Sequence, residues 1–507
     1  MRTHNKSTTN EVSPEPVSGH LTSNGGSANS SNSSNSSNSS SSAASSAGSS
    51  AGNVDSGIGA AGAFGENSEK LGLLTRRHVV GGLLGGVGAL AFNGLRPTPA
   101  TAARASTPLQ TQVTPGAPSS GVAVASPAIA NVAKAAPGNG ILVLLTLYGG
   151  NDGLNTVVPN SSLYLAARGE LAHQPNTTLK LDDAFGLNPA MPGFKSLWDA
   201  KRLAIVRGVG YPNPNRSHFR SMDIWQTAAP DRNEISGWLG RWHDATGGDP
   251  LRMVNIGASM PRAMVSIKGG GGAALPNGNL ILPGGAGVSK VFAELGRTPS
   301  TLGPLANKVL GNNNDLLRVV EKFSPILKGE IAGGGAVSLE GGATANGDNR
   351  TQLDNQLDEV ARLVNGGAPT RVFSVSLGGF DTHASEKESH ARLLSAVDQA
   401  VTRFVNTMAA SPNGSKVTVV IYSEFGRRVA ANDSGGTDHG TANSVFIVGP
   451  QVNGGFYGDA PSLSDLDDGD VKFTTDFRGV YSSLLSNVLG IDPAAVLGKA
   501  FAPLLVV

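Results

Sequence analysis

Five short apolar runs, each beside a glycine-bracketed polar cluster, most constrain the fold of this 507-residue chain. The first run, residues 141–147, is continuously apolar, as expected for a strand buried on both faces of a parallel sheet. Further runs occur at residues 202–206, 371–376, 417–422 and 445–448. Residues 350–364 and 388–408 carry apolar side chains at helical spacing. Strands alternating with helices predict an α/β fold, with a mainly parallel sheet and helices on both faces.

The composition excludes several classes of protein. The chain has 39 Lys and Arg against 38 Asp and Glu, a formal net charge of +1. This balance argues against a nucleic-acid-binding protein and against a polybasic membrane binder. There is no cysteine, which excludes disulfide scaffolds, thiolate metal sites and cysteine nucleophiles.

The N-terminal part of the chain predicts export. Residues 1–74 are rich in Ser and Asn and are expected to be disordered. Arg76 and Arg77 precede a Gly-rich apolar run too short to span a bilayer, so residues 75–105 resemble a twin-arginine signal peptide. The alternative is a chance arginine pair before a Gly/Ala linker. Export predicts a periplasmic or secreted protein that uses the twin-arginine machinery and keeps no stable membrane span after signal removal.

The folded part is expected to follow a linker. Residues 106–138 are rich in Pro, Ala and Ser and predict a tether. Residues 139–507 then remain for one large α/β domain. Two Gly-rich insertions within it, near 269–287 and 329–347, are expected to be surface loops.

Three polar residues near the predicted strand ends are candidate ligands of a divalent ion. Open α/β sheets bind ligands beyond the carboxyl ends of their strands. Asp381 and His383 are two residues apart, so both side chains leave the same face of an extended segment. Together with His439 they would form a three-ligand site for Zn, Mn, Mg or Ca. The alternative is that Asp381 caps the following helix and His383 lies beside its first turn.

Asp152 and Glu424 are candidate ligands of a second ion. Asp152 follows the first predicted strand and Glu424 follows the fourth. Paired ions can hold the attacking and leaving oxygens during displacement at phosphorus. The structural alternatives are hydrogen bonding of Asp152 within its own turn and pairing of Glu424 with Arg427. The site would therefore hold one or two ions.

Ser217 is the candidate nucleophile. It lies where a Pro/Asn-rich loop meets a predicted helix, and a helix N-terminus favours an anion. His218 is a candidate acid and Arg216 a candidate anion clamp. The alternatives are a plain N-cap at Ser217 and pairing of its two neighbours with acidic residues.

These motifs, in this order, resemble a known family from about Leu142 to the C-terminus. They are Gly149-Gly-Asn-Asp-Gly153, Pro214-Asn-Arg-Ser-His-Phe219, Gly378-Gly-Phe-Asp-Thr-His383, Ser423-Glu-Phe-Gly-Arg427 and Thr437-Asp-His-Gly440. The resemblance is to the exported bacterial family called domain of unknown function 1501, which is sulfatase-like and belongs to the alkaline phosphatase superfamily. It implies an alkaline-phosphatase-like fold. It also implies Asp152 as the first-strand metal ligand, Ser217 as the nucleophile position, Asp381, His383 and His439 around one ion, and Glu424 at the other.

The sequence departs from the superfamily pattern in three ways. Glu424-Phe425 stands where an Asp-His pair is usual, the Asp381-to-His383 spacing is short, and the usual sulfatase nucleophile motif is missing. The resemblance implies a metal-dependent hydrolase of phosphate or sulfate esters, on a small molecule or a polysaccharide. The rival reading is an exported binding or envelope protein that keeps the fold, and one ion, without turnover. Fold alone does not decide between the two.

Overall fold

A computed structural model describes residues 138–507, apart from 269, 277–279, 281–284, 298–300, 302 and 330–350. The described residues lie in one compact unit, Val122–Val507. The predicted tail at 1–74 and the predicted signal peptide at 75–105 lie outside the described residues. So do the predicted linker at 106–138, except for its last residue, and nearly all of the predicted loop at 329–347.

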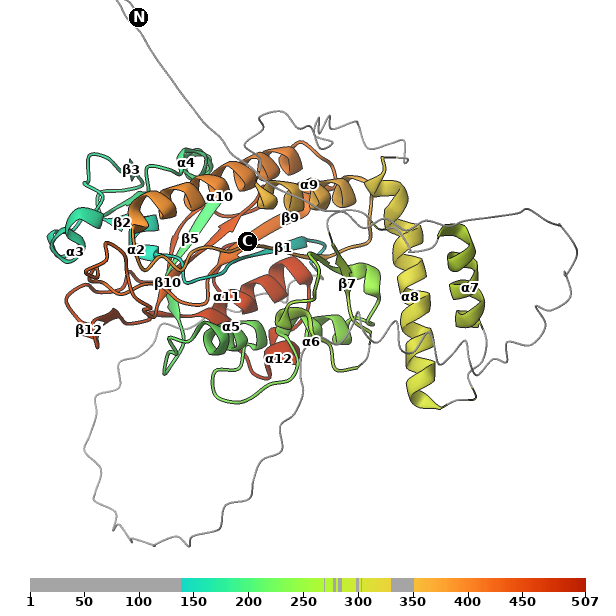
Figure 1. Ribbon diagram of the computed structural model, residues 1–507. Helices are drawn as coiled ribbons and strands as arrows, with labels where there is room; N and C mark the ends of the chain where they lie inside the picture. Colours follow the sequence, from blue (N-terminus) through green and yellow to red (C-terminus); the bar gives the residue numbers. More distant parts are fainter. Residues whose placement is uncertain are drawn as a thin grey trace, which may run out of the picture. The chain divides into compact units, whose positions relative to one another are not determined.

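The centre of the unit is a nine-stranded sheet (Figure 1). Its order is β11 (Gly455–Tyr457), β5 (Leu203–Gly210), β10 (Asn443–Val448), β9 (Val417–Tyr422), β1 (Ile141–Leu147), β8 (Val372–Leu377), β6 (Met253–Ile256) and β7 (Ala273–Leu275), and β14 (Thr475–Asp476) also pairs with β5. β10 is antiparallel to both of its neighbours. The other pairs are parallel. The predicted, mainly parallel sheet is therefore confirmed.

Helices cover both faces of the sheet, as predicted (Figure 1). One face packs against α4 (Pro192–Asp199), α8 (Pro304–Leu327), α9 (Gln352–Asn365) and α10 (Glu386–Ala409). The other packs against α5 (His218–Thr227), α6 (Trp238–Ala245), α11 (Phe477–Ser483) and α12 (Pro493–Leu497). Alternate residues of β1 enter the two cores, Val143 and Leu145 on one side and Leu142 and Leu144 on the other. This double burial explains why β1 is continuously apolar.

The strand predictions were accurate where a run is wholly buried. β1 and β9 have the predicted bounds, and β5, β8 and β10 overlap the predicted runs. The stretch near 269–287 is not a simple loop in its described part, because it contains β7 and the start of α7 (Gly285–Arg297). β7 extends the sheet beside β6.

Smaller elements border the main sheet. β2 (Val157–Pro159), β4 (Phe185–Leu187) and β3 (Leu179–Lys180) form a separate antiparallel sheet, and β12 (Leu466–Asp467) pairs with β13 (Asp470–Val471). The short helices α2 (Gly153–Thr156) and α3 (Ser162–Arg168) follow β1 and β2. Within the described part of the chain, no helix combines the length and apolar character needed to span a membrane.

Candidate metal centre

Polar loops meet at one edge of the sheet. The loop after β8 carries Asp381 and His383, and the loop after β9 carries Glu424. His439 comes before β10, and because β10 runs antiparallel, its N-terminal end lies at the same edge. His218 begins α5, the helix after β5. The predicted gathering of these residues therefore depends on the reversed direction of one strand.

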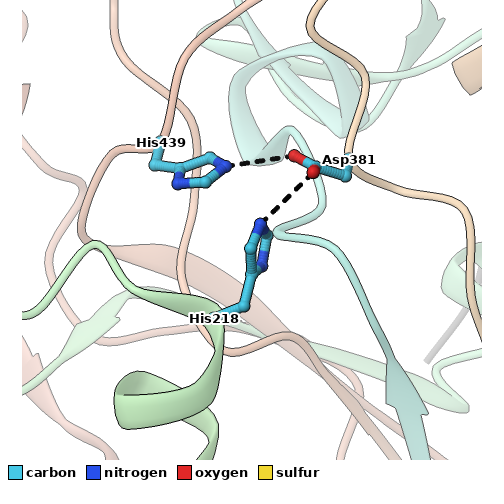
Figure 2. Close-up of side chains that lie close together, drawn as sticks. All are labelled: His218, Asp381 and His439. Atoms are coloured by element: carbon cyan, nitrogen blue, oxygen red, sulfur yellow. Dashed lines mark hydrogen bonds and ion pairs between the residues drawn. The ribbon is translucent and has the colours of Figure 1, made fainter.

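Three imidazoles converge on one carboxylate in this cluster. Figure 2 shows His218 and His439 directed at Asp381, and one ligand atom from each lies within 4.8 Å of the others. His439 Nε2 is 3.1 Å from Asp381 Oδ1, and His218 Nε2 is 3.4 Å from Oδ2. His383 Nε2 lies 2.9 Å from Asp381 Oδ1 and 2.9 Å from His439 Nε2. We call these four residues the open cluster.

Each imidazole of the open cluster also has an oxygen partner at Nδ1. The partners are Glu424 Oε1 for His218 (2.9 Å), Asp438 Oδ1 for His383 (3.0 Å) and the backbone oxygen of Arg216 for His439 (2.8 Å). A carbonyl or an ionised carboxylate only accepts hydrogen bonds, so Nδ1 carries the proton and a neutral ring presents a bare Nε2. Protein imidazoles that bind metal ions are oriented in this way.

None of the three Nε2 atoms in the open cluster faces a hydrogen-bond donor. His218 Nε2 is buried without a hydrogen bond. The Nε2 atoms of His383 and His439 face each other, although both rings use their Nδ1 protons elsewhere. Lone pairs directed at one another and at a carboxylate call for a cation among them, so the residues fit a divalent ion.

The fully buried Arg427 forms an ion pair with Asp381. Its Nη2 lies 2.7 Å from Asp381 Oδ1, and its other donors reach backbone oxygens of Gly150 (2.7 Å) and Thr437 (2.8 Å). Burial raises the pKa of Asp381, but the hydrogen bond and positive charge of Arg427, together with the neighbouring histidines, outweigh burial and lower this pKa to about 2. Asp381 is therefore ionised at neutral pH.

The glycine turn after β1 fits closely against the open cluster. Gly149 has φ +119°, and a side chain there would collide with the backbone of Asp381. Its N–H donates to Glu424 Oε1 over 2.9 Å. Glu424 is nearly fully buried, and its Oε2 accepts from the hydroxyl of Ser423 over 3.0 Å. Glu424 is thus held where it orients His218.

Asp152 has a different place from the one expected of an ion ligand. It is fully buried, and both of its oxygens accept from Arg168 of α3, Oδ1 over 2.9 Å. Oδ1 also accepts from Leu154 N (3.1 Å) as the N-cap of α2. Burial raises the pKa of Asp152, yet Arg168 lowers it far below its usual range. Because both oxygens are occupied, the structure gives Asp152 the structural alternative, hydrogen bonding within its own turn, rather than a second ion site with Glu424.

The residues around Ser217 are arranged differently from the expectation. Ser217 is the N-cap of α5, as predicted, but its exposed hydroxyl makes no capping hydrogen bond. Arg216 pairs with Asp470, Nε to Oδ2 over 2.8 Å, and with Asp468 over 3.2 Å, so it is not a free anion clamp. His218 turns towards Asp381 and joins the open cluster.

Sequence reasoning missed three contributions to the site. It treated His218 as an acid rather than as a member of the open cluster, and it assigned no part in this site to Arg427 or Asp438. A signal for His218 was present, since it is one of three histidines in the polar clusters. The backbone oxygen of Arg216 gives no signal in a sequence.

Comparison with known proteins supports the family resemblance. Residues 345–499 match the model of a family described as protein of unknown function, DUF1501, so the predicted resemblance is confirmed over that segment. No curated protein matches the chain.

Several solved structures are similar to the chain at low identity. A protein in the alkaline phosphatase superfamily from Vibrio parahaemolyticus has 12% identity and a TM-score of 0.34, over 73% of this chain and 72% of that chain. The C-terminal periplasmic domain of EcEptC from Escherichia coli, in complex with Zn, has 12% identity and a TM-score of 0.33, over 70% and 84%. Ps i-CgsB in complex with k-i-k-neocarrahexaose has 11% identity and a TM-score of 0.31, over 71% and 72%.

Proposed function

We propose that the chain is an exported, sulfatase-like, metal-dependent hydrolase of phosphate or sulfate esters, with one divalent ion on the open cluster. The observation that carries the proposal is the convergence of three imidazole Nε2 atoms on one ionised carboxylate. Each Nδ1 atom is already bound to an oxygen, so the Nε2 atoms are the ones left for an ion.

The donor set favours zinc. Three nitrogens and one carboxylate oxygen suit Zn²⁺ and then Mn²⁺, whereas Mg²⁺ and Ca²⁺ prefer oxygen ligands throughout. A bound ion would supply positive charge to polarise an ester oxygen or to activate a nucleophile.

The chain's own groups prepare the site for that charge. Arg427 keeps Asp381 ionised and fixed in front of the imidazoles. Glu424 and Asp438 accept the Nδ1 protons of His218 and His383, which makes the opposite nitrogens better donors. These contacts all come from the protein, so the side chains of the open cluster are held in place without any contact from a substrate.

The ion is tested by stoichiometry and by one matched pair of variants. We expect about one zinc per chain after reconstitution, and His439→Ala should lower zinc affinity by more than the roughly 100-fold typical of losing a supporting partner. His173→Ala is the control, because His173 pairs with Asn188 and is no part of the open cluster. Equal zinc content in wild type and His439→Ala would reject the site.

Ser217 is proposed as the attacking hydroxyl. It adjoins His218, and its hydroxyl is not committed to a capping bond. A serine hydroxyl is a weak nucleophile at neutral pH and needs activation, which a nearby cation provides. Ser217→Ala should lower turnover of aryl phosphate or sulfate esters by orders of magnitude while zinc content stays the same. Unchanged turnover would assign the attack to water instead.

A binding protein without turnover is the second candidate. The observation that favours it is the ion pair of Asp152 with Arg168, which leaves no first-strand carboxylate for a second ion. A zinc-loaded protein that hydrolyses no phosphate or sulfate ester above background would support this candidate over the hydrolase.

Export by the twin-arginine route remains part of the proposal. It rests on Arg76 and Arg77 before a short apolar run. Replacing both arginines with lysine should retain the precursor in the cytoplasm, and normal export of that variant would refute the route.

A further inference from the structure

A groove extends from the open cluster along α5. It has a volume of about 540 Å³ and reaches His218 and Asp381 at one end. Four further residues of α5, Phe219, Met222, Asp223 and Gln226, line its length. With His218 they occupy positions i, i+1, i+4, i+5 and i+8, which is one face of a helix. Eight residues at 1.5 Å each give a groove about 12 Å long.

The groove is larger than an ester group needs. Pockets of about 300–1,000 Å³ hold drug-sized organic ligands. The end at the open cluster would take the phosphate or sulfate, so the remaining length is available for the alcohol part of the ester.

Two aromatic side chains make the groove suitable for a ring. Phe219 is 91% exposed, which is unusual for a phenylalanine, and Tyr148, which also lines the groove, is 36% exposed. The hydroxyl of Tyr148 accepts from Gln226 Nε2 over 3.2 Å, which fixes the tyrosine. Flat rings of a substrate can pack against such aromatic surfaces.

The groove is also lined by an arginine whose side chain is fixed by contacts within the protein. Arg262, which begins the short turn η3 (Arg262–Met264), donates from Nη2 to the backbone oxygen of Glu234 over 2.6 Å. Its Nε is 3.4 Å from Asp223 Oδ1, and Arg220 takes the other oxygen of Asp223 over 2.8 Å. Two guanidinium groups thus share one carboxylate, and a positive charge remains at the groove wall. A fixed arginine is a strong partner for an anionic group.

We infer that this groove binds the leaving group of the substrate and selects a ring-bearing alcohol that carries a second anionic group, with the ring against Phe219 and Tyr148 and the anion on Arg262. This inference rests on the proposed function for the ester end of the groove. The shared chemistry is a ring that offers an apolar face and carries an anion, whether that face belongs to an aryl group or to the C–H side of a sugar.

Matched esters test the role of Arg262. The probes are 2-naphthyl and 6-carboxy-2-naphthyl esters of phosphate and of sulfate, compared by kcat/KM. The wild type should prefer the carboxylated ester, and Arg262→Gln should reduce this preference by about tenfold or more, as expected for a lost charge-assisted hydrogen bond. The plain naphthyl ester should be hydrolysed equally by both proteins. A pyranose ester with and without a carboxylate distinguishes the two kinds of ring.

Phe219 is tested with a change of ring size. Phe219→Ala should raise KM several-fold for the naphthyl esters and leave methyl phosphate or sulfate unchanged. Equal KM values of wild type and Phe219→Ala for the naphthyl esters would show that Phe219 does not bind the ring.

Equilibrium binding separates the groove from catalysis. The probe is 6-hydroxy-2-naphthoate, measured by fluorescence titration, which needs no turnover. Arg262→Gln should weaken its binding about tenfold or more, and Arg232→Gln, an exposed arginine paired with Asp231, should not. If Arg262→Gln behaves like the wild type in both assays, the inference that the groove binds the leaving group is rejected. Arg262-dependent binding without ester hydrolysis supports the groove and rejects the hydrolase.

Discussion

Two aspartates in this molecule are each bound to a fully buried arginine, with opposite consequences. Asp152 lies beside Arg168 in the interior, and neither side chain is exposed. Asp381 lies beside Arg427 at the sheet edge, and its side chain is 47% exposed. Arg168 takes both oxygens of Asp152, whereas Arg427 takes only Oδ1 of Asp381 and leaves Oδ2 facing His218.

The histidines near the two aspartates differ in the same way. His390, near Asp152, is fully buried, and its Nε2 is hydrogen-bonded to Asn151 (2.9 Å). The histidines of the open cluster are partly exposed and direct Nε2 towards Asp381. An aspartate, an arginine and nearby histidines are therefore not enough to indicate an ion site. What matters is whether oxygen and nitrogen lone pairs remain free and can be reached from solvent.

The largest effects are expected from breaking one ion pair in the buried region, by which we mean Asp152, Arg168, Glu386 and His390, and one beside the open cluster. Arg168→Met leaves Asp152 buried without its cation and should destabilise the protein by about 3–5 kcal/mol, with zinc affinity unchanged. Asp381→Asn should do the reverse, with zinc affinity lost and a smaller loss of stability, because Arg427 keeps its backbone acceptors. Urea denaturation in chelator and zinc titration measure the two properties.

The comparison would be wrong if Arg168→Met lost zinc affinity or if Asp381→Asn kept it. Loss of zinc affinity in Arg168→Met, without loss of the fold, would place Asp152 at the ion after all. A wild-type zinc affinity in Asp381→Asn would show that the Asp381 carboxylate is not needed to bind the ion.

The second prediction concerns the carboxylates that support each region. Glu424→Gln keeps an oxygen near His218 but loses the charge, so zinc affinity should fall about 10- to 100-fold at unchanged stoichiometry. Glu386 of the buried region is fully buried, and its Oε2 accepts from the hydroxyl of Thr437 over 2.6 Å. Glu386→Gln should leave zinc affinity unchanged. A fall in stoichiometry from two ions to one in Glu424→Gln would instead support the second ion site expected from the sequence.

The sequence predicted the fold best where burial is complete. β1 and β9 were placed at their observed bounds because a continuously apolar run is typical of a strand with a core on each side. The direction of β10 could not be predicted locally, because it depends on pairing with β5 and β9. The small β2–β4–β3 sheet was missed because its strands have only two or three residues.

The site was predictable to the extent that its residues share short segments. Asp381 and His383 were paired from their spacing, and the structure places both in the open cluster. The pairing of Asp152 with Arg168 was not predicted, because Arg168 lies in another helix and nothing in the local pattern shows that the two meet. Contacts between distant segments decide which carboxylate is free.

The third prediction concerns the dependence of stability on pH, which per pH unit is the smallest of the three effects. The two regions differ in the pH range over which their groups contribute. Burial, and then Asp152, raises the pKa of Glu386 to about 9, so the folded state holds a proton there that the unfolded chain releases above about 4.5. Burial lowers the pKa of His390 to about 4, so the unfolded chain holds an extra proton below about 6.5. Glu386 therefore favours folding at low pH, and its contribution is lost as the pH rises towards 9. His390 has the opposite sign, and its contribution is lost as the pH falls from 6.5 to 4.

These two contributions offset each other between about pH 4.5 and 6.5. Burial also raises the pKa of Glu359 to about 7, so Glu359 adds a loss of stability as the pH rises to about 7. Above pH 7 Glu386 alone of these three groups acts, and its contribution should fall by at most about 1.4 kcal/mol per pH unit up to pH 9. Asp381 adds nothing to this window, because its lowered pKa of about 2 means that its contribution is lost only below about pH 3.8. Urea denaturation of zinc-free protein from pH 5 to 9 measures the slope, and Glu386→Gln should flatten it above pH 7. An unchanged slope in Glu386→Gln would show that Glu386 is ionised beside Asp152, and the buried region would then lack the proton that distinguishes it from the open cluster.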